Sequence, residues 1–119
     1  MFTIEHTDIG LITVSKEAVE TVAGLAAIDS YGLVGMVPRE WKTGIGAILG
    51  LESVRKGVEV KEAPDGLVVD VYIIVGYGAK ISVVAENVMQ KVHYVLEETA
   101  GLKVSRVNVN VQGVKVEKE

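Results

Sequence analysis

The chain has 119 residues, of which 23 are valine and 9 isoleucine, but only one Phe, one Trp and no Cys. This length corresponds to one domain, and the many β-branched residues indicate a protein rich in strands. The net charge of −4 argues against generic binding to a phosphate backbone, and the lack of cysteine excludes disulfides, thiolate metal sites and cysteine nucleophiles.

The N-terminal residues 1–6 contain neither a basic segment nor an apolar run, so we expect no signal peptide. The longest run of apolar residues and glycine, 44–51, is far shorter than the roughly 20 residues of a membrane span. We therefore expect a soluble, cytoplasmic protein without direct membrane insertion.

The first half of the chain predicts a strand at 10–14, a helix from Ser15 to about Ser30, and a second strand at 33–37. Ser15 is the candidate N-cap of this helix, and apolar residues recur along it at helical spacing. Its many small residues predict close packing against a neighbouring element.

The segment 38–57 departs from this pattern. Trp41, Ile45, Ile48 and Leu49 could form a short apolar face on a helical turn. Glycines among them weaken such a helix by about 1 kcal/mol each relative to alanine. We expect a variable insertion that could be mobile.

The second half predicts a hairpin of strands 58–62 and 67–77, because Pro-Asp-Gly at 64–66 is typical of a turn. A helix is expected from Ser82, as its N-cap, to Gly101, as its left-handed C-terminal residue. The last strand starts at Lys103, and Gly113 interrupts its alternation as a bulge would.

The predicted order is therefore βαβ, a variable segment and ββαβ. This order favours an α+β fold: a two-layer sandwich of ferredoxin-like split βαβ units, with two main helices on one face of a mixed sheet. We expect residues 1–119 to form a single domain.

No pattern indicates a catalytic or metal site. His6 and His93 lack partners at a metal-binding spacing, and the glycines of 44–50 do not have the spacing of a dinucleotide-binding loop. Gly-x-x-Gly at 32–35 matches the loop of KH domains, but its apolar interior is better explained as a helix end followed by a strand. We predict no enzyme activity, no cofactor and no metal.

One face of the sheet is the best candidate for an interaction surface. Alternation puts Asp70 among apolar residues of strand 67–77, where it is either solvated or, beneath a second subunit, paired with a residue such as Arg106. Polar residues alternate along the last strand and form a row on one of its faces. Together with the apolar residues of 38–57, the candidate surface comprises Trp41, Ile45, Ile48, Leu49, Val68, Tyr72, Ile74, Arg106, Asn108 and Asn110.

Six blocks of the sequence occur in an order that resembles the alkaline shock protein family of Gram-positive bacteria. The blocks are 22–27, 32–36, 56–60, 69–78, 84–92 and 107–114. Val-Ala-Glu-Asn-Val at 84–88 and Val-Asn-Val-Asn-Val-Gln-Gly-Val at 107–114 are the most specific, and the resemblance covers nearly the whole chain. Val83 departs from the family, whose members often have proline there; this difference concerns capping.

The resemblance implies a non-enzymatic structural or adaptor protein of the cell-envelope stress response, without catalytic residues. It also implies self-association into a homo-oligomer, and attachment to the membrane through a small anchor protein. Two alternatives remain open: a nucleic-acid-binding module with a KH-like loop, although no nucleic acid is expected as a partner, or a small-ligand regulatory domain.

Overall fold

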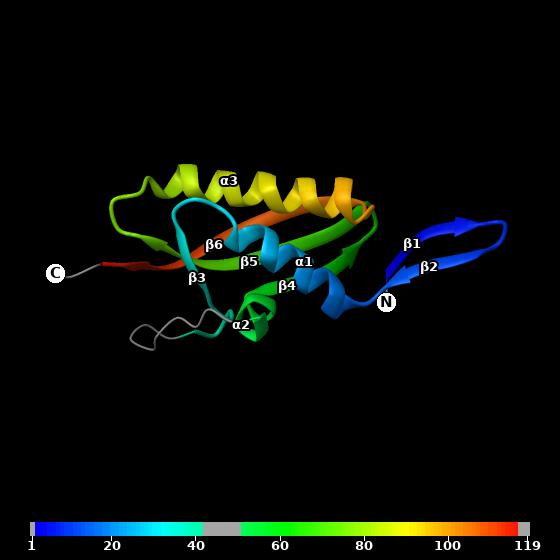
Figure 1. Cartoon of the computed structure of the whole chain (residues 1–119), viewed down its shortest axis with the longest axis horizontal. Helices are drawn as coiled ribbons and strands as arrows, with labels where there is room; N and C mark the ends of the chain where they lie inside the picture. The colour runs from blue at the N-terminus through cyan, green and yellow to red at the C-terminus, as the bar shows by residue number, and fades with distance from the viewer. Residues whose placement is uncertain (1, 42–50, 117–119) are drawn as a thin grey trace.

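A computed structural model describes residues 2–41 and 51–116. Its elements, shown in Figure 1, are β1 (Phe2–Thr7), β2 (Gly10–Val14), α1 (Lys16–Ile28), β3 (Leu33–Met36), α2 (Leu51–Lys56), β4 (Val58–Ala63), β5 (Gly66–Gly76), α3 (Ile81–Tyr94), the π-helical turn η1 (Val95–Thr99) and β6 (Val104–Lys115).

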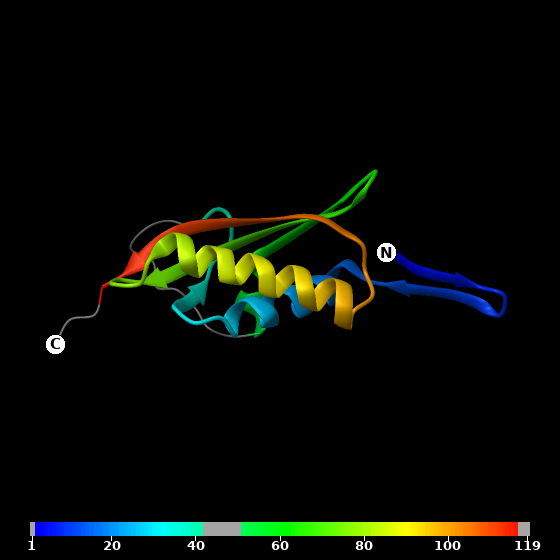
Figure 2. The ribbon, with the colours of Figure 1, turned by 90° about the horizontal axis from the view of Figure 1, so that it is seen from above.

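The long strand β5 is the centre of a mixed four-stranded sheet. β4 and β3 pair with it antiparallel along one edge, one after the other, and β6 pairs with it parallel along the other edge. α1 and α3 lie together on one face of this sheet (Figures 1 and 2). The predicted class is confirmed: an α+β fold of two layers, with two main helices on one face of a mixed sheet.

One detail of the expected connectivity differs. β5, α3 and β6 form the predicted parallel crossover, but the strand before α1 does not join the main sheet. β2 pairs instead with β1, a strand that the sequence interpretation missed, in a separate two-stranded sheet. The first βαβ unit is therefore replaced by a hairpin that precedes α1.

The main core lies between the sheet and the helices. Alternate residues of β5 face the helices, and Val69, Val71, Ile73 and Val75 are fully buried there. From α3, the predicted stripe of Val84, Val88 and Val92 is buried against them. Apolar residues that repeat every 2 positions in the strand and about every 3.6 positions in the helix thus form the two surfaces of one core.

Both helices largely follow their predicted boundaries. The Ser15 side chain accepts a hydrogen bond from the Ala18 backbone N–H at 3.1 Å and caps α1 as expected. Ser82, however, is not the N-cap of α3, because the helix begins at Ile81 and its capping position is Lys80, which makes no side-chain cap bond. At the other end, Gly101 has the predicted positive φ of 74°.

The hairpin and the bulge of the second half are confirmed. β4 and β5 pair from Val58↔Val71 to Ala63↔Gly66, so the Pro-Asp-Gly segment forms the turn. In β6 the register with β5 shifts between Val111 and Gly113, as the interrupted alternation predicted.

The β1–β2 hairpin, which we call the arm (residues 2–14), projects from one end of the molecule (Figures 1 and 2). Its base is anchored in the core by Phe2, Ile4 and Val14. Every residue from 5 to 13 is exposed. The arm helps to make the molecule elongated, with extents of 60 × 24 × 21 Å.

Candidate functional site

The sheet face opposite the helices, which we call the open face, brings together much of the predicted interaction surface. The register pairs Val68 with Arg106 and Tyr72 with Asn110. It also pairs Asp70 with Asn108. Residues far apart in the sequence are therefore neighbours on this face, through the parallel pairing of β5 with β6.

Asp70 is half-buried and is held by the neighbouring strand. Its Oδ1 accepts a hydrogen bond from Asn108 Nδ2 at 2.9 Å. Within one chain, Asp70 is thus neither fully solvated nor paired with Arg106, which is exposed. Asn110 Nδ2 donates to the Val71 carbonyl at 3.4 Å. Both asparagines therefore have structural hydrogen bonds within the chain.

Part of the open face is covered by the chain itself. Tyr72 and Ile74 are 7% and 4% exposed and form a second small core with Val37. Trp41 is half-buried and packs against this cluster. Because Tyr72 and Ile74 are buried, they cannot contact another molecule. Val68, which is half-buried, and Arg106, which is exposed, remain accessible on the open face. The predicted residues Ile45, Ile48 and Leu49 lie outside the described residues.

The phenol of Tyr72 is the most perturbed group of this face. Burial raises the pKa of Tyr72 above its ordinary value of 10.0, and the negative charges of Glu59 and Asp70 raise this pKa further. The Tyr72 hydroxyl donates a hydrogen bond to Glu59 Oε1 at 3.4 Å, and Arg39 lies 3.8 Å from the same oxygen. The folded chain therefore favours the neutral phenol.

This shift predicts sensitivity to alkali. A pKa raised by folding stabilises the fold fully below the ordinary pKa, and this stabilisation is lost as pH rises through the folded pKa. The free energy of unfolding should thus fall more steeply above about pH 10 in the native chain than in Tyr72→Phe. Urea denaturation at a series of alkaline pH values measures both slopes; equal slopes would show that Tyr72 is not responsible.

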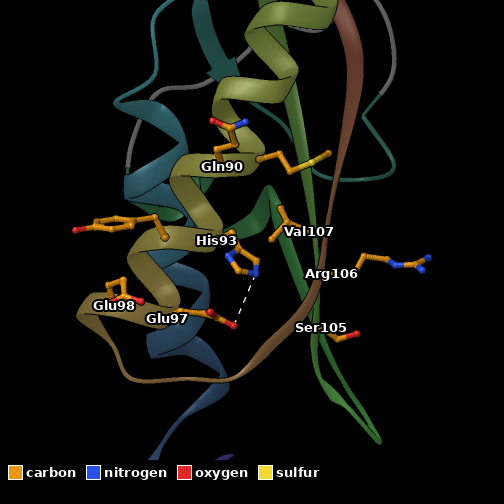
Figure 3. A pocket seen from close by; sticks show the side chains of 9 residues that line it. Gln90, His93, Glu97, Glu98, Ser105, Arg106 and Val107 are labelled. Carbon is orange, nitrogen blue, oxygen red and sulfur yellow. Dashed lines mark ion pairs between the residues drawn. The ribbon is translucent and has the colours of Figure 1, made fainter.

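A groove of about 610 Å³ lies between α3, η1 and the start of β6. Figure 3 shows His93 and Glu97 pointing toward one another in it, whereas Arg106 points away from the helix. His93 Nε2 lies 3.7 Å from Glu97 Oε2, and this same oxygen accepts a hydrogen bond from the Val104 backbone N–H at 3.0 Å. Glu97 therefore has a structural role, because it holds the first residue of β6 against the helix.

Neither the groove nor its surroundings suggest a metal centre. In the described part of the chain, no three His, Asp or Glu side chains gather as they would around a metal ion. The Gly-x-x-Gly segment at 32–35 begins with Gly32 at φ 90° and continues into β3, which agrees with a helix end followed by a strand and not with a KH loop.

Several of the exposed apolar side chains lie at the two ends of the molecule, and others lie along the helices. On the arm, Ile9 is 98% exposed at the tip, and Leu11 and Ile12 are about half exposed. At the opposite end (Figure 1), the β5–α3 connection and the end of β6 enclose an apolar hollow of about 530 Å³. We call this the far-end hollow; it is lined by Gly76, Tyr77, Gly78, Ala79, Ile81, Val114 and Val116.

The sequence interpretation did not single out either end. A signal for the arm was present, because Asp8 and Gly10, residue types common in turns, separate two short segments rich in β-branched residues. The far-end hollow had no such signal, since it is created by the parallel pairing of β5 and β6. The two segments that line it, 76–81 and 114–116, are separated by more than 30 positions in the sequence.

These features define a small α+β domain with exposed apolar side chains on the arm and around the far-end hollow. Comparison with known proteins identifies it further: residues 4–116 match the alkaline shock protein family, which is described as having a cell envelope-related function. The chain belongs to this family, which confirms the resemblance predicted from the sequence blocks.

Relatives agree with this assignment. YloU of Bacillus subtilis, titled an uncharacterized protein, is 47% identical over 112 residues, which are 93% of each chain. Spy1614 of Streptococcus pyogenes is 40% identical over the same share. A Streptococcus pyogenes protein titled stress response regulator gls24 homolog is 26% identical over 92% of this chain and 62% of its own length.

No solved structure matches the chain significantly. None of the helices in the described segments 2–41 and 51–116 is long and apolar enough to cross a membrane. The family assignment therefore rests on sequence, and it places the protein in a cell-envelope-related family with stress-response relatives.

Proposed function

We propose that this protein is a non-enzymatic structural or adaptor protein of the envelope stress response, which acts in the cytoplasm by self-association and through protein partners. One of these partners would be a small membrane-anchored protein that brings it to the envelope. The family's envelope-related description and the stress-response title of a relative support the biological setting.

The observation that carries the proposed self-association is the arm. An isolated two-stranded hairpin is at best marginally stable in water, yet this one keeps its outer residues, 5–13, exposed beyond the anchored base. Contiguous apolar patches larger than about a few hundred Å² are rare on monomeric proteins and mark interaction sites; the arm exposes Ile9, Leu11 and Ile12. Burial of Ile9 and its neighbours against another protein would recover about 25 cal/mol for each Å² of apolar surface removed from water.

Co-capture of two differently tagged copies from cells under envelope stress tests this proposal. The bait carries one tag and the prey a second, so only self-association brings the prey into the eluate. We expect the prey to be recovered with the bait, and an unrelated cytosolic protein carrying the prey tag serves as the control. Recovery of bait without prey, with both proteins abundant and folded, would contradict the proposal.

A further inference from the structure

We propose that the tip of the arm of one copy docks into the far-end hollow of a second copy, so that copies join head to tail. This inference rests on the proposed self-association and specifies its contact. Both surfaces expose apolar side chains and lie at opposite ends of the same elongated molecule (Figures 1 and 2), and the segments that carry them differ in the sign of their charged residues.

The tip of the arm is a formed protrusion. Thr7 Oγ1 accepts hydrogen bonds from the Ile9 and Gly10 backbone N–H groups at 3.3 and 3.1 Å, and donates to the Gly10 carbonyl at 3.1 Å. The turn is thereby fixed with the Ile9 side chain outward, 98% exposed. A preorganised protrusion loses little conformational freedom on binding.

The far-end hollow presents apolar side chains that an apolar residue of another copy would contact. Tyr77 and Val116 at its rim are 77% and 58% exposed, and Ile81 and Val114 are nearly half exposed. Its frame is held by the hydrogen bond from the Tyr77 backbone N–H to the Lys115 carbonyl at 2.9 Å. An apolar side chain entering it would remove surface from water on both copies.

Charge complements this apolar match. The arm, 2–14, contains two acidic residues, Glu5 and Asp8, and no Lys or Arg. The segments 76–81 and 114–116 contain two exposed lysines, Lys80 and Lys115, and no acidic residue. Neither lysine lines the hollow itself, so the two charges lie beside it. Asp8 is adjacent to Ile9 in the turn, so docking of the tip would bring opposite charges together. Such complementarity favours this pairing over contact between two arms.

The placement of the surfaces determines the kind of assembly. A contact between two different surfaces of one chain is heterologous, and it produces a closed ring or an open chain, depending on the rotation between copies. In an open chain, each added copy buries one arm and leaves another exposed, whereas a closed ring leaves no arm exposed. We expect assemblies larger than a dimer in either case.

Mixing two association-defective variants tests this contact. Ile9→Asp damages the arm but keeps the hollow, and Tyr77→Asp damages the hollow but keeps the arm. We expect each purified variant alone to be monomeric by sedimentation velocity. Their mixture should form dimers that do not grow, because one intact arm meets one intact hollow. Leu25→Asp, which alters a 48% exposed apolar residue on α1, is the matched control and should associate like the native chain.

The outcomes separate this inference from the proposed function. A native chain that is monomeric at every concentration overturns both. If the native chain associates and both variants associate equally well, the head-to-tail contact is wrong while self-association stands. Association lost in Ile9→Asp but kept in Tyr77→Asp would show an arm-to-arm contact and would also overturn the inference.

Charge reversal provides a second test that does not alter apolar residues. Asp8→Lys should weaken association, and a copy carrying Lys80→Glu and Lys115→Glu should weaken it as well. A mixture of the two variants should associate more strongly than either alone, because their charges are again opposite. Absence of this recovery would contradict the proposed pairing of charges, and circular dichroism confirms that each variant is folded.

Discussion

Replacing Gly24 with valine should destabilise the fold by about 3 kcal/mol, toward the upper end of the usual cost of overpacking. Gly24 is buried where α1 crosses α2, and a Cβ placed on it would collide with Val54 Cγ1 and lie 2.7 Å from the Val54 carbonyl oxygen. The backbone contact cannot be relieved by rotating a side chain. Against a typical total stability of about 5–15 kcal/mol, this loss is large.

Urea denaturation followed by circular dichroism measures this loss. Gly10→Ala is the control, because a Cβ at Gly10 meets nothing within 4 Å, and its midpoint should stay close to that of the native chain. A Gly24→Val protein with a native midpoint would mean that α1 and α2 separate without cost, and that their close packing does not support the core.

Shortening the arm should abolish self-association without loss of stability. Replacing residues 6–11 with Asn-Gly keeps the pairs from Phe2↔Val14 to Glu5↔Ile12 and closes them with a turn that suits a two-residue hairpin loop. The core contacts of Phe2, Ile4 and Val14 are kept. The residues removed are exposed, so the free energy of unfolding should change by no more than about 0.5 kcal/mol.

Light scattering and urea denaturation of the shortened protein measure the two effects separately. Ile9→Leu, which keeps an apolar tip, should associate like the native chain. If the shortened protein associated normally, the arm would not be the contact. If it unfolded, the base and the outer part of the arm would form one cooperative unit, contrary to the exposure of residues 5–13.

Elements governed by local patterns were well predicted. Ser15 caps α1, the stripe of Val84, Val88 and Val92 is buried, and Gly113 follows the register shift in β6. Each of these features depends on residues close in sequence, where periodicity and capping dominate. The same holds for the Pro-Asp-Gly turn between β4 and β5.

Features that depend on a choice between alternative contacts were not predicted. The strand at Gly10–Val14 was expected, but its choice of β1 over the main sheet results from competition between alternative partners, which periodicity does not describe. Likewise, strand alternation correctly predicted that Tyr72 and Ile74 lie on the open face, but it did not predict that both are buried. Their cover comes from Val37 and Trp41, in a segment without regular periodicity.

The candidate surface was therefore predicted only in part. Val68 and Arg106 were both expected in the candidate surface, and the structure pairs them across β5 and β6; alternation sets which face of a strand a residue occupies, but not which strand lies beside it. The arm and the far-end hollow required the three-dimensional arrangement, since an exposed Ile9 or Tyr77 is not distinguishable from a core residue by composition alone. Exposure in the folded chain is what marks them as contact surfaces.

The mass of the purified native chain, measured by light scattering over a wide range of concentration, tests self-association most directly. We predict a mass that rises with concentration and passes beyond that of a dimer, because the head-to-tail contact repeats from copy to copy in an open chain or until a ring closes. High salt should lower the mass, since opposite charges contribute to the contact. A mass equal to one chain at every concentration would contradict the proposed function and the contact inferred from it.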